Sequence, residues 1–253
     1  MNSGRAPLRI AHAYGNSRRA LAEALAAEID MIEADIWFRS GRVWVRHEPR
    51  LGPIPLLADR RPKGVRYVGP WAVPIWPGHY VRPDVHGLSL DELLERAGGR
   101  RLLLDVKGRY DGAQAEGFVA ALAGLPPERA VVCGQVWGLL DRLRERATRL
   151  EVRYSIERQG QWERFLRLLA EDDDAGRVCI EHRFMDEERA RFLEDEGVDV
   201  YCWTVDDATE AERLAAAGVD GIISNDLGLL ASLGRLREAR VPTPPPDSSL
   251  RSE

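Results

Sequence analysis

The residues best suited to chemistry lie in the stretch MIEADIWFRSGRVWVRHEP, at residues 31–49. Two carboxylates, Glu33 and Asp35, lie two positions apart in an apolar run, and His47 follows a short way downstream. Side chains two positions apart on a strand project from the same face, so the two carboxylates point the same way. Acidic side chains are rarely buried without a partner, because an unpaired buried charge is costly. The pattern therefore indicates a cation between Glu33 and Asp35.

Short apolar runs alternate with segments of helical period along most of the chain. We expect strands at residues 8–13, 31–38, 101–107, 130–134, 151–156, 177–183, 198–205 and 220–225. We expect helices at residues 17–28, 89–97, 113–123, 136–147, 160–171, 186–195, 207–217 and 227–240. Eight strand and helix pairs predict an α/β protein whose parallel sheet closes as a (β/α)8 TIM barrel. A doubly wound open sheet is the alternative.

The segment at residues 48–88 interrupts this alternation, and it is rich in proline and aromatic residues. Insertions of this length in a compact domain are usually functional or disordered, and the aromatic content favours an ordered one. We therefore expect a loop inserted after the second strand, packed over the barrel mouth and setting substrate choice. Residues 1–240 then form a single domain, and residues 241–253 form a flexible C-terminal tail.

Other polar residues fall at the C-terminal ends of the expected strands, where the chemistry of such barrels is built. His12 ends the first strand, and Asp105 with Lys107 ends the third. Glu33, Asp35 and Asp105 therefore converge on one rim. Carboxylate oxygens suit hard divalent cations, so the three predict a site for Mg²⁺ or Ca²⁺ rather than zinc. The alternative is a buried ion network of Glu33 and Asp35 with Lys107 and an arginine.

Two histidines are placed to act on a substrate at this rim. His12 ends a strand, and His47 follows a short hairpin at residues 39–45 that folds back over the same rim. Two imidazoles near a cation can serve as general acid and general base at neutral pH. Such equipment suits the cleavage of a phosphodiester. The other histidines are expected in structural or loop positions: His79, His86 and His182.

The composition excludes several classes of protein. A net charge of -5 and an isoelectric point of about 5.7 argue against a partner such as nucleic acid, whose binding needs clustered Lys and Arg. No run approaches the roughly 20 apolar residues of a membrane-spanning helix, so stable membrane insertion is not expected. The N-terminus also lacks the apolar core of a signal peptide. We therefore expect a cytoplasmic protein acting on a small molecule, and the sequence leaves its oligomeric state open.

The cysteines support the same location. Cys133, Cys179 and Cys202 are widely spaced, and each lies in an apolar run typical of a strand. We expect them to be small core residues in a reducing compartment rather than a disulfide framework or a zinc site.

Several motifs, taken in their order along the chain, resemble the glycerophosphodiester phosphodiesterase family. They follow His12 and are IEAD at 32–35, VRHEP at 45–49, GLSLDELLERA at 87–97, LDVKG at 104–108, WTVDD at 203–207 and AGVDGIISND at 217–226. The resemblance spans roughly residues 8–230. It implies a TIM barrel that hydrolyses phosphodiesters of glycerol with a divalent cation, usually Mg²⁺ or Ca²⁺.

The resemblance also implies roles for single residues. Glu33, Asp35 and Asp105 match the metal ligands of the family. His12 and His47 match its acid/base pair. Which histidine is the base is left open.

Further positions match less tightly. Lys107 matches a basic residue close to the phosphate, and Trp203 matches an aromatic residue at the pocket wall, although it could equally be a core residue. Asn16 could contact the metal or the phosphate, or cap the following helix. Two residues depart from the family pattern. Ala13 stands where an arginine is typical, and Asp105 where glutamate is common. Losing that arginine removes a bidentate phosphate contact, which affects substrate preference.

Two alternatives follow from these departures. Asp105 with Lys107 also resembles the sphingomyelinase D branch of the superfamily, which cleaves choline phospholipids. Those proteins are secreted and carry a disulfide in the loop after the second histidine, whereas residues 48–88 contain no cysteine. Ala13 also raises a second alternative, a barrel that binds a phosphorylated ligand without cleaving it.

Overall fold

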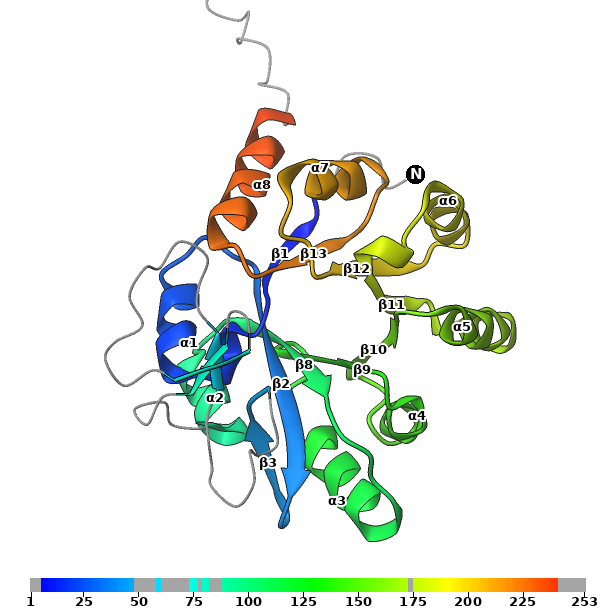
Figure 1. Ribbon diagram of the computed structural model, residues 1–253. Helices are drawn as coiled ribbons and strands as arrows, with labels where there is room; N and C mark the ends of the chain where they lie inside the picture. Colours follow the sequence, from blue (N-terminus) through cyan, green and yellow to red (C-terminus); the bar gives the residue numbers. More distant parts are fainter. Residues whose placement is uncertain are drawn as a thin grey trace, which may run out of the picture.

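The computed structural model describes residues 6–47, 58–60, 73–76, 79–81, 88–172 and 175–240. Its main feature is a closed barrel of parallel strands (Figure 1). In spatial order the strands are β1 (Leu8–Ala11), β13 (Gly221–Ser224), β12 (Asp199–Trp203), β11 (Arg177–Glu181), β10 (Glu151–Ile156), β9 (Ala130–Gly134), β8 (Arg101–Val106) and β2 (Met31–Arg39). Pairing of β1 with β2 closes the ring. The predicted TIM barrel is thus confirmed, and the open sheet is excluded.

The helices form an outer ring around these strands, as Figure 1 shows for α3 to α8. They are α1 (Arg18–Leu25), α2 (Leu90–Arg96), α3 (Gly112–Ala123), α4 (Trp137–Arg146), α5 (Gln159–Glu171), α6 (Glu187–Asp195), α7 (Ala208–Ala216) and α8 (Leu227–Arg240). Two short 3-10 turns, η1 (Tyr14–Asn16) and η3 (His182–Phe184), follow β1 and β11. Within the described ranges, no helix is long and apolar enough to cross a membrane.

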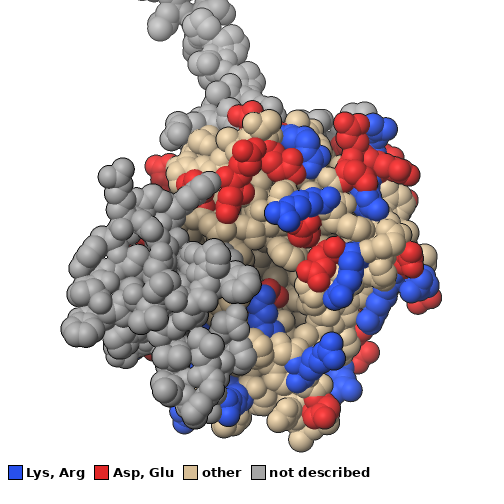
Figure 2. Space-filling view, viewed as in Figure 1, with Lys and Arg blue, Asp and Glu red and all other residues tan. Residues whose placement is uncertain are grey.

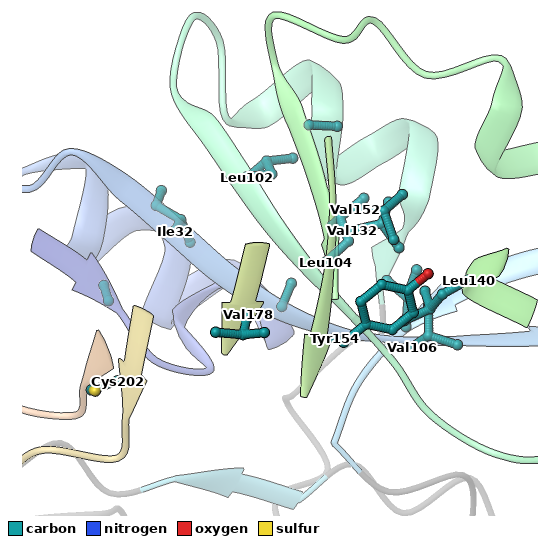
Figure 3. Packing of buried hydrophobic residues seen from close by; sticks show 14 of the residues in the cluster. Ile32, Leu102, Leu104, Val106, Val132, Leu140, Val152, Tyr154, Val178 and Cys202 are labelled. Atoms are coloured by element: carbon teal, nitrogen blue, oxygen red, sulfur yellow. The ribbon is translucent and has the colours of Figure 1, made fainter. Parts of the chain in front are cut away.

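The barrel strands are apolar on both faces because each face packs against protein. On β8, Leu102, Leu104 and Val106 point outward and pack in the layer between the strands and the helices (Figure 3). Leu103 belongs to a second cluster that fills the barrel interior. Strand residues alternate between the faces, so Asp105, two positions after Leu103, faces the interior as well. This alternation delivers polar side chains to the barrel axis.

At the N-terminal end of the barrel, one arginine closes the interior. Arg153 on β10 is fully buried, and its guanidinium lies 3.3 Å from the ring centroid of Tyr201. It forms ion pairs with Glu151 at 2.7 Å and Asp199 at 2.9 Å, which are the first residues of their strands. A buried charge needs such partners, so this network plugs the end of the barrel away from the strand C-termini.

The predicted hairpin after the second strand is confirmed. β3 (Arg42–Val45) pairs antiparallel with β2 and with β7 (Leu88–Ser89). The turn between β2 and β3 contains Ser40 and Gly41, both with positive φ angles. The described parts of the following insertion are the antiparallel strands β4 (Ala58–Arg60), β5 (Val73–Trp76) and β6 (His79–Val81). The rest of the predicted loop, including His86, lies outside the described residues, as does the predicted tail at 241–253.

Strands β1 and β11 each end two residues before the position that the sequence predicts. β1 ends at Ala11, because Ala13 adopts a left-handed conformation with φ of 62°. β11 ends at Glu181, where η3 begins. His12 therefore lies in the loop that follows β1, which allows its side chain to turn over the rim.

Candidate active site

A cavity of about 770 Å³ opens at the C-terminal end of the barrel. Figure 2 shows the hollow at the centre of this face, with basic and acidic side chains inside it. Its lining includes six of the residues singled out in the sequence: His12, Glu33, His47, Asp105, Lys107 and Trp203. Barrel closure thus brings together residues from β2, β8, β12 and the loops after β1, β3 and β8, as the sequence predicts.

Three carboxylates form the centre of the site. Glu33 and Asp35 lie on β2, and Asp105 lies beside Asp35 in the register of β2 with β8. Glu33 and Asp35 are 3% and 1% exposed, so both are buried acids. One oxygen from each of the three lies within 4.8 Å of the others. Opposite oxygen ligands of a cation are separated by about twice a metal–oxygen distance of roughly 2.0–2.5 Å, so this spacing suits one divalent ion.

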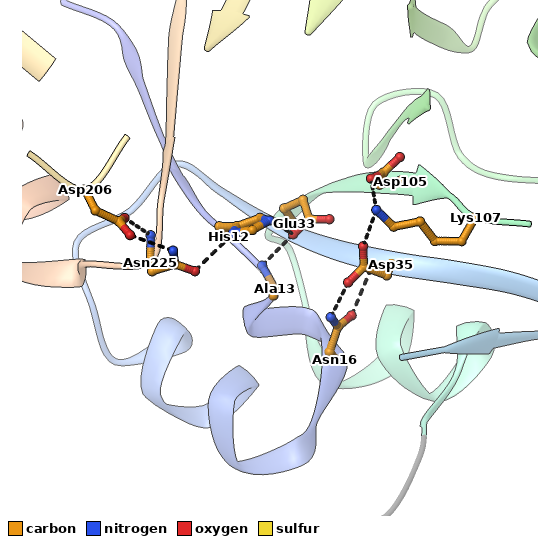
Figure 4. A network of polar contacts seen from close by, with 9 residues as sticks. All are labelled: His12, Ala13, Asn16, Glu33, Asp35, Asp105, Lys107, Asp206 and Asn225. Carbon is orange, nitrogen blue, oxygen red and sulfur yellow. Dashed lines mark hydrogen bonds and ion pairs between the residues drawn. The ribbon is translucent and has the colours of Figure 1, made fainter. Parts of the chain in front are cut away.

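Lys107 provides positive charge within this cluster. Its Nζ lies 2.9 Å from Oδ1 of Asp35 and also forms an ion pair with Asp105 (Figure 4). Burial lowers the pKa of Lys107, but the carboxylates of Asp105, Asp35 and Glu33 outweigh burial and raise its pKa above the ordinary value. The ammonium is therefore charged at neutral pH. The ion network proposed as the alternative for these acids is present, with Lys107 but without an arginine among the described contacts of Glu33 and Asp35.

The three acids differ in their affinity for protons. Burial raises the pKa of Glu33 well above its ordinary value, and the nearby Asp35 and Asp105 raise it further. Burial also raises the pKa of Asp105, to about 6, with Lys107 opposing the rise. At Asp35 the burial effect is outweighed by Lys107, His47 and His12, so its pKa is lowered. Without a cation, the cluster therefore holds a proton on Glu33 before it holds one on Asp35.

The loop after β1 holds two of these carboxylates in place. Asn16 donates from Nδ2 to Oδ2 of Asp35 at 2.6 Å, and its Oδ1 accepts from the backbone N–H of Asp35 at 2.8 Å. The backbone N–H of Ala13 donates to Oε2 of Glu33. Ala13 thus contributes through its backbone, and this contact does not depend on the arginine typical at that position. Close packing of the same loop against β2 requires Gly15, where a Cβ would lie 2.4 Å from that of Ala34.

Asn16 does not cap a helix, so that alternative is wrong. The N-cap of α1 is Ser17, whose side chain accepts a hydrogen bond from the backbone N–H of Ala20. The amide of Asn16 is instead occupied by Asp35. Asn16 thus orients this carboxylate, and its contact with a metal or phosphate stays a prediction.

The carboxylate cluster fits a hard divalent cation. All three groups offer oxygen, the donor that Mg²⁺ and Ca²⁺ prefer. Oδ1 of Asp35 is buried and receives no hydrogen bond within the described structure, although Lys107 lies within ion-pair distance. An acceptor without a donor at good geometry, placed beside two further carboxylates, is suited to coordinate a cation.

Both histidines line the cavity together with Glu33 and Asp105. His12 directly follows β1, with its Nδ1 3.0 Å from Oδ1 of Asn225 and its Nε2 3.8 Å from Oε2 of Glu33. His47 follows β3 and lines the cavity. Its backbone is anchored by Trp37, whose Nε1 donates to the carbonyl of Arg46 at 3.0 Å and to that of His47 at 3.3 Å.

Trp203 serves both of the roles that the sequence leaves open. It ends β12, packs against the cluster that fills the barrel interior, and lines the cavity. Its Nε1 is buried and has no hydrogen-bond acceptor among the described residues. The ring therefore offers the cavity an apolar surface.

Sequence reasoning assigned no role to three residues that support the histidines: Trp37, Asp206 and Asn225. Trp37 lies in the same stretch as Glu33 and Asp35, with the same strand parity, which places it on the same face. Asn225 directly follows the last barrel strand, at the rim where the chemistry is built. Asp206 also lies in the motif WTVDD at 203–207, and Asn225 lies in AGVDGIISND at 217–226. These positions were the signals in the sequence that could have identified the three residues.

Part of the C-terminal half of the chain matches a known family. Residues 125–229 match the model of the Glycerophosphoryl diester phosphodiesterase family. A segment of 56 residues is 36% identical to glycerophosphodiester phosphodiesterase GDPD4 of Arabidopsis thaliana. That alignment covers 22% of this chain and only 17% of the plant protein, so the chain matches a small part of that relative.

Solved structures resemble nearly the whole barrel. A candidate glycerophosphoryl diester phosphodiesterase from Silicibacter pomeroyi has a TM-score of 0.69 at 21% identity, covering 92% of this chain and 95% of its own. A phosphodiesterase from Oleispira antarctica, solved with its product sn-glycerol-3-phosphate, has a TM-score of 0.67 at 17% identity, covering 90% and 97%. A glycerophosphodiester phosphodiesterase from Thermotoga maritima has a TM-score of 0.64 at 16% identity, covering 89% and 98%. At these identities the likeness establishes a shared fold.

Proposed function

From the resemblance to the glycerophosphodiester phosphodiesterase family, which the comparisons confirm, we propose that this protein hydrolyses glycerophosphodiesters with the help of a divalent cation. The substrates would be deacylated phospholipids, and the products an alcohol and glycerol 3-phosphate. The observation that carries the proposal is the convergence of a carboxylate cluster, a lysine and two histidines on one cavity. The Oleispira antarctica protein, whose fold is shared, binds sn-glycerol-3-phosphate and supports this choice of substrate.

In this proposal, Glu33, Asp35 and Asp105 hold the cation, which is Mg²⁺ or Ca²⁺. When bound, such a cation supplies Lewis-acid stabilisation of charge on a phosphate oxygen. Lys107 adds a second positive charge at the phosphate, since it lines the cavity beside the same carboxylates. Trp203 contributes an apolar wall for the substrate.

His12 and His47 move the protons. One histidine removes a proton from the substrate's hydroxyl adjacent to the phosphate, and the hydroxyl oxygen then bonds to phosphorus. The bond from phosphorus to the leaving alcohol breaks, and the other histidine protonates the departing alkoxide. A cyclic phosphate results. Water then opens the ring with the histidine roles exchanged, which yields glycerol 3-phosphate and restores both histidines.

A direct assay tests the activity. We expect release of alcohol from a panel of glycerophosphodiesters in Mg²⁺ or Ca²⁺, and loss of that release in EDTA. Detection of a transient cyclic glycerophosphate would support attack by the substrate hydroxyl. If no alcohol were released from any of these substrates with either cation, hydrolysis would be refuted and the alternative of a barrel that only binds its ligand would be favoured. Activity confined to choline phospholipids would instead support the sphingomyelinase D-like alternative.

Two variants test the acid/base pair. His12→Ala and His47→Ala are each expected to lower kcat by roughly 10²–10⁴, because general acid–base catalysis contributes about that factor. His182→Ala is a matched control, since His182 lies on η3 and contacts Glu210 rather than the cavity. Wild-type turnover in either cavity variant would remove that histidine from the mechanism.

A cytoplasmic location stays a prediction from the sequence. The three cysteines are free and buried in this structure. Cys133 and Cys179 face the barrel interior, as small core residues should.

A further inference from the structure

A chain of hydrogen bonds runs to His12 from Asp206, in the loop after β12, and Asn225, in the loop after β13. Nδ1 of His12 lies 3.0 Å from Oδ1 of Asn225, a residue 213 positions away in the sequence. Nδ2 of Asn225 donates to Oδ2 of Asp206 at 2.7 Å, and the backbone N–H of Asn225 donates to Oδ1 of Asp206 at 2.8 Å. Figure 4 shows this chain approaching the carboxylate cluster from the side opposite Lys107.

The donors around Asp206 decide which way the Asn225 amide faces. Both oxygens of Asp206 are acceptors. Oδ1 accepts from the Asn225 backbone N–H and also from Ser224 Oγ at 2.9 Å, and Oδ2 faces the Asn225 side chain. Ser224 Oγ itself accepts from the backbone N–H of Asp226 at 3.0 Å, so the hydroxyl proton is available to Asp206. An amide oxygen turned toward Asp206 would place two acceptors together. The amide nitrogen of Asn225 therefore faces Asp206, and its oxygen faces His12.

The orientation of the amide then decides where His12 carries its proton. An amide oxygen only accepts, so the nitrogen opposite it must donate. The backbone of Asn225 is held as well, since its carbonyl accepts from the hydroxyl of Tyr14 at 3.1 Å. His12 itself is fixed by its backbone N–H, which donates to the carbonyl of Ser224 at 2.8 Å.

We propose that Asp206 and Asn225 are positioning residues that hold neutral His12 in the tautomer with its proton on Nδ1, which makes His12 the general base of the first step. This assignment rests on the proposed function for its catalytic meaning, although the tautomer itself does not. The other nitrogen, Nε2, is directed toward Glu33, with 3.8 Å between Nε2 and Oε2, at the wall of the cavity. In this tautomer Nε2 has a lone pair and no proton.

The role of each histidine follows from the proton balance. Neutral His12 can take the hydroxyl proton of the substrate at Nε2 and become doubly protonated, while its Nδ1–H stays bonded to Asn225. The electron pair of the broken O–H bond forms the new bond to phosphorus. The departing alkoxide takes a proton from His47, which must enter the step protonated. The second step, with water, returns one proton to His47 and removes one from His12.

The tautomer is read by NMR of protein labelled with ¹⁵N-histidine, at about pH 9, where an ordinary imidazole with a pKa near 6.5 is neutral. Protonated and unprotonated ring nitrogens have distinct ¹⁵N shifts, and a His12→Gln spectrum assigns the His12 signals. We expect a proton on Nδ1 of His12 in wild-type protein, with Mg²⁺ and with EDTA alike. A proton on Nε2 would overturn the proposal.

Asp206→Asn provides the sharpest variant, because its shape is nearly unchanged. Its amide oxygen would keep the donors from Ser224 and from the Asn225 backbone, so its NH₂ would face the Asn225 side chain. That amide is then expected to turn over and present its own NH₂ to His12, which selects the tautomer with the proton on Nε2. Asn225→Ala should release the preference for Nδ1. Unchanged Nδ1 protonation in both variants would overturn the proposal.

Matched controls separate positioning from general disturbance. Ser224→Ala removes one donor to Asp206 without touching the Asn225 side chain, so the His12 tautomer should not change. His182, whose Nδ1 lies 3.2 Å from Glu210, serves as an internal reference in every spectrum.

Kinetics supply a second readout. Asp206→Asn is expected to lower kcat by roughly 10²–10⁴ with a much smaller change in KM, since a wrong tautomer removes base catalysis and not binding. An unchanged kcat alongside a reversed tautomer would overturn the role of His12 as base. If instead wild-type protein hydrolysed no diester, the proposed function would fail while the tautomer measurement still stood.

Discussion

Replacement of Lys107 by methionine would test how the carboxylate cluster is balanced without a cation. Lys107 is the charged partner of both Asp35 and Asp105, and methionine keeps a similar apolar stem without the ammonium. The variant leaves three clustered carboxylates with no opposing ammonium. We expect lower stability in EDTA, and a larger gain in stability on adding Mg²⁺ or Ca²⁺ than in wild-type protein, because the cation restores the missing positive charge.

The size of the loss follows from burial. Removing one partner of a buried ion pair costs about 3–5 kcal/mol, and the side chain of Asp35 is only 1% exposed. Lys107 is 31% exposed, so the lower end applies. A loss of about 3 kcal/mol corresponds to a fall in Tm of roughly 6–12 °C for a chain of this size. Arg142→Met is the matched control, because it breaks an ion pair with Glu116 whose side chains are 51% and 60% exposed. Such exposed pairs contribute about 0–1 kcal/mol.

The loss should depend on pH with a definite sign. The pKa of Asp105 is raised to about 6, above its ordinary value, so folded protein binds this proton more tightly than unfolded protein. Stability from this group is therefore fully present below the unfolded pKa near 4 and falls as the pH rises through about 6. Lys107 lowers the pKa of Asp35 and Asp105, and its removal extends that fall to higher pH. Urea unfolding in EDTA should show a larger deficit at about pH 8 than at about pH 5.5. An equal deficit at both values, or one no larger than that of Arg142→Met, would refute the reasoning.

Three further substitutions address the supports of the site. Asn16→Ala should weaken Mg²⁺ or Ca²⁺ binding by roughly 10–100-fold in calorimetry, because Asp35 loses the amide that orients it, and unchanged affinity would contradict this role. Trp37→Phe removes the donor to the carbonyl of His47 and should lower kcat more than it raises KM in steady-state assays; a change in KM alone would count against it. Arg153→Met should lower the free energy of unfolding by about 3–5 kcal/mol in urea titrations, since it breaks a buried network, while folded protein keeps its kcat.

The barrel was predictable because its signals are local. Each strand reads as an apolar run bounded by a helical segment, and each repeats the same physical requirement of burial on two faces. The cap of α2 is also local, since the Ser89 side chain accepts from the backbone N–H of Glu92, three residues on, at 3.2 Å. Gly197 and Gly218 follow α6 and α7 with φ angles of 67° and 81°, the conformation that ends helices most easily with glycine.

The contacts that complete the site were not predictable, because they join distant segments through side-chain geometry. Asn16 could cap a helix or reach into the site on sequence grounds, and only the placement of Ser17 at the N-cap decides between these. The short turn that carries Asn16 toward Asp35 depends on the left-handed backbone conformation of Ala13. Alanine rarely adopts this conformation, so the sequence does not predict it. Asn225 meets His12 only once the barrel closes.

The two interpretations of the acidic cluster, a metal site and a buried ion network, are compatible in this fold. Three carboxylates close enough to share a cation repel one another strongly without one. Lys107, two residues from Asp105 and in contact with Asp35, supplies a counter-charge to these acids when no cation is bound. The same position keeps the ammonium at the cavity, 31% exposed, where an incoming phosphate would find it. Because a divalent cation brings more positive charge to the carboxylates than the ammonium does, its binding would free Lys107 to face the phosphate. The lysine would thus stabilise the acids in one state and the substrate in the other.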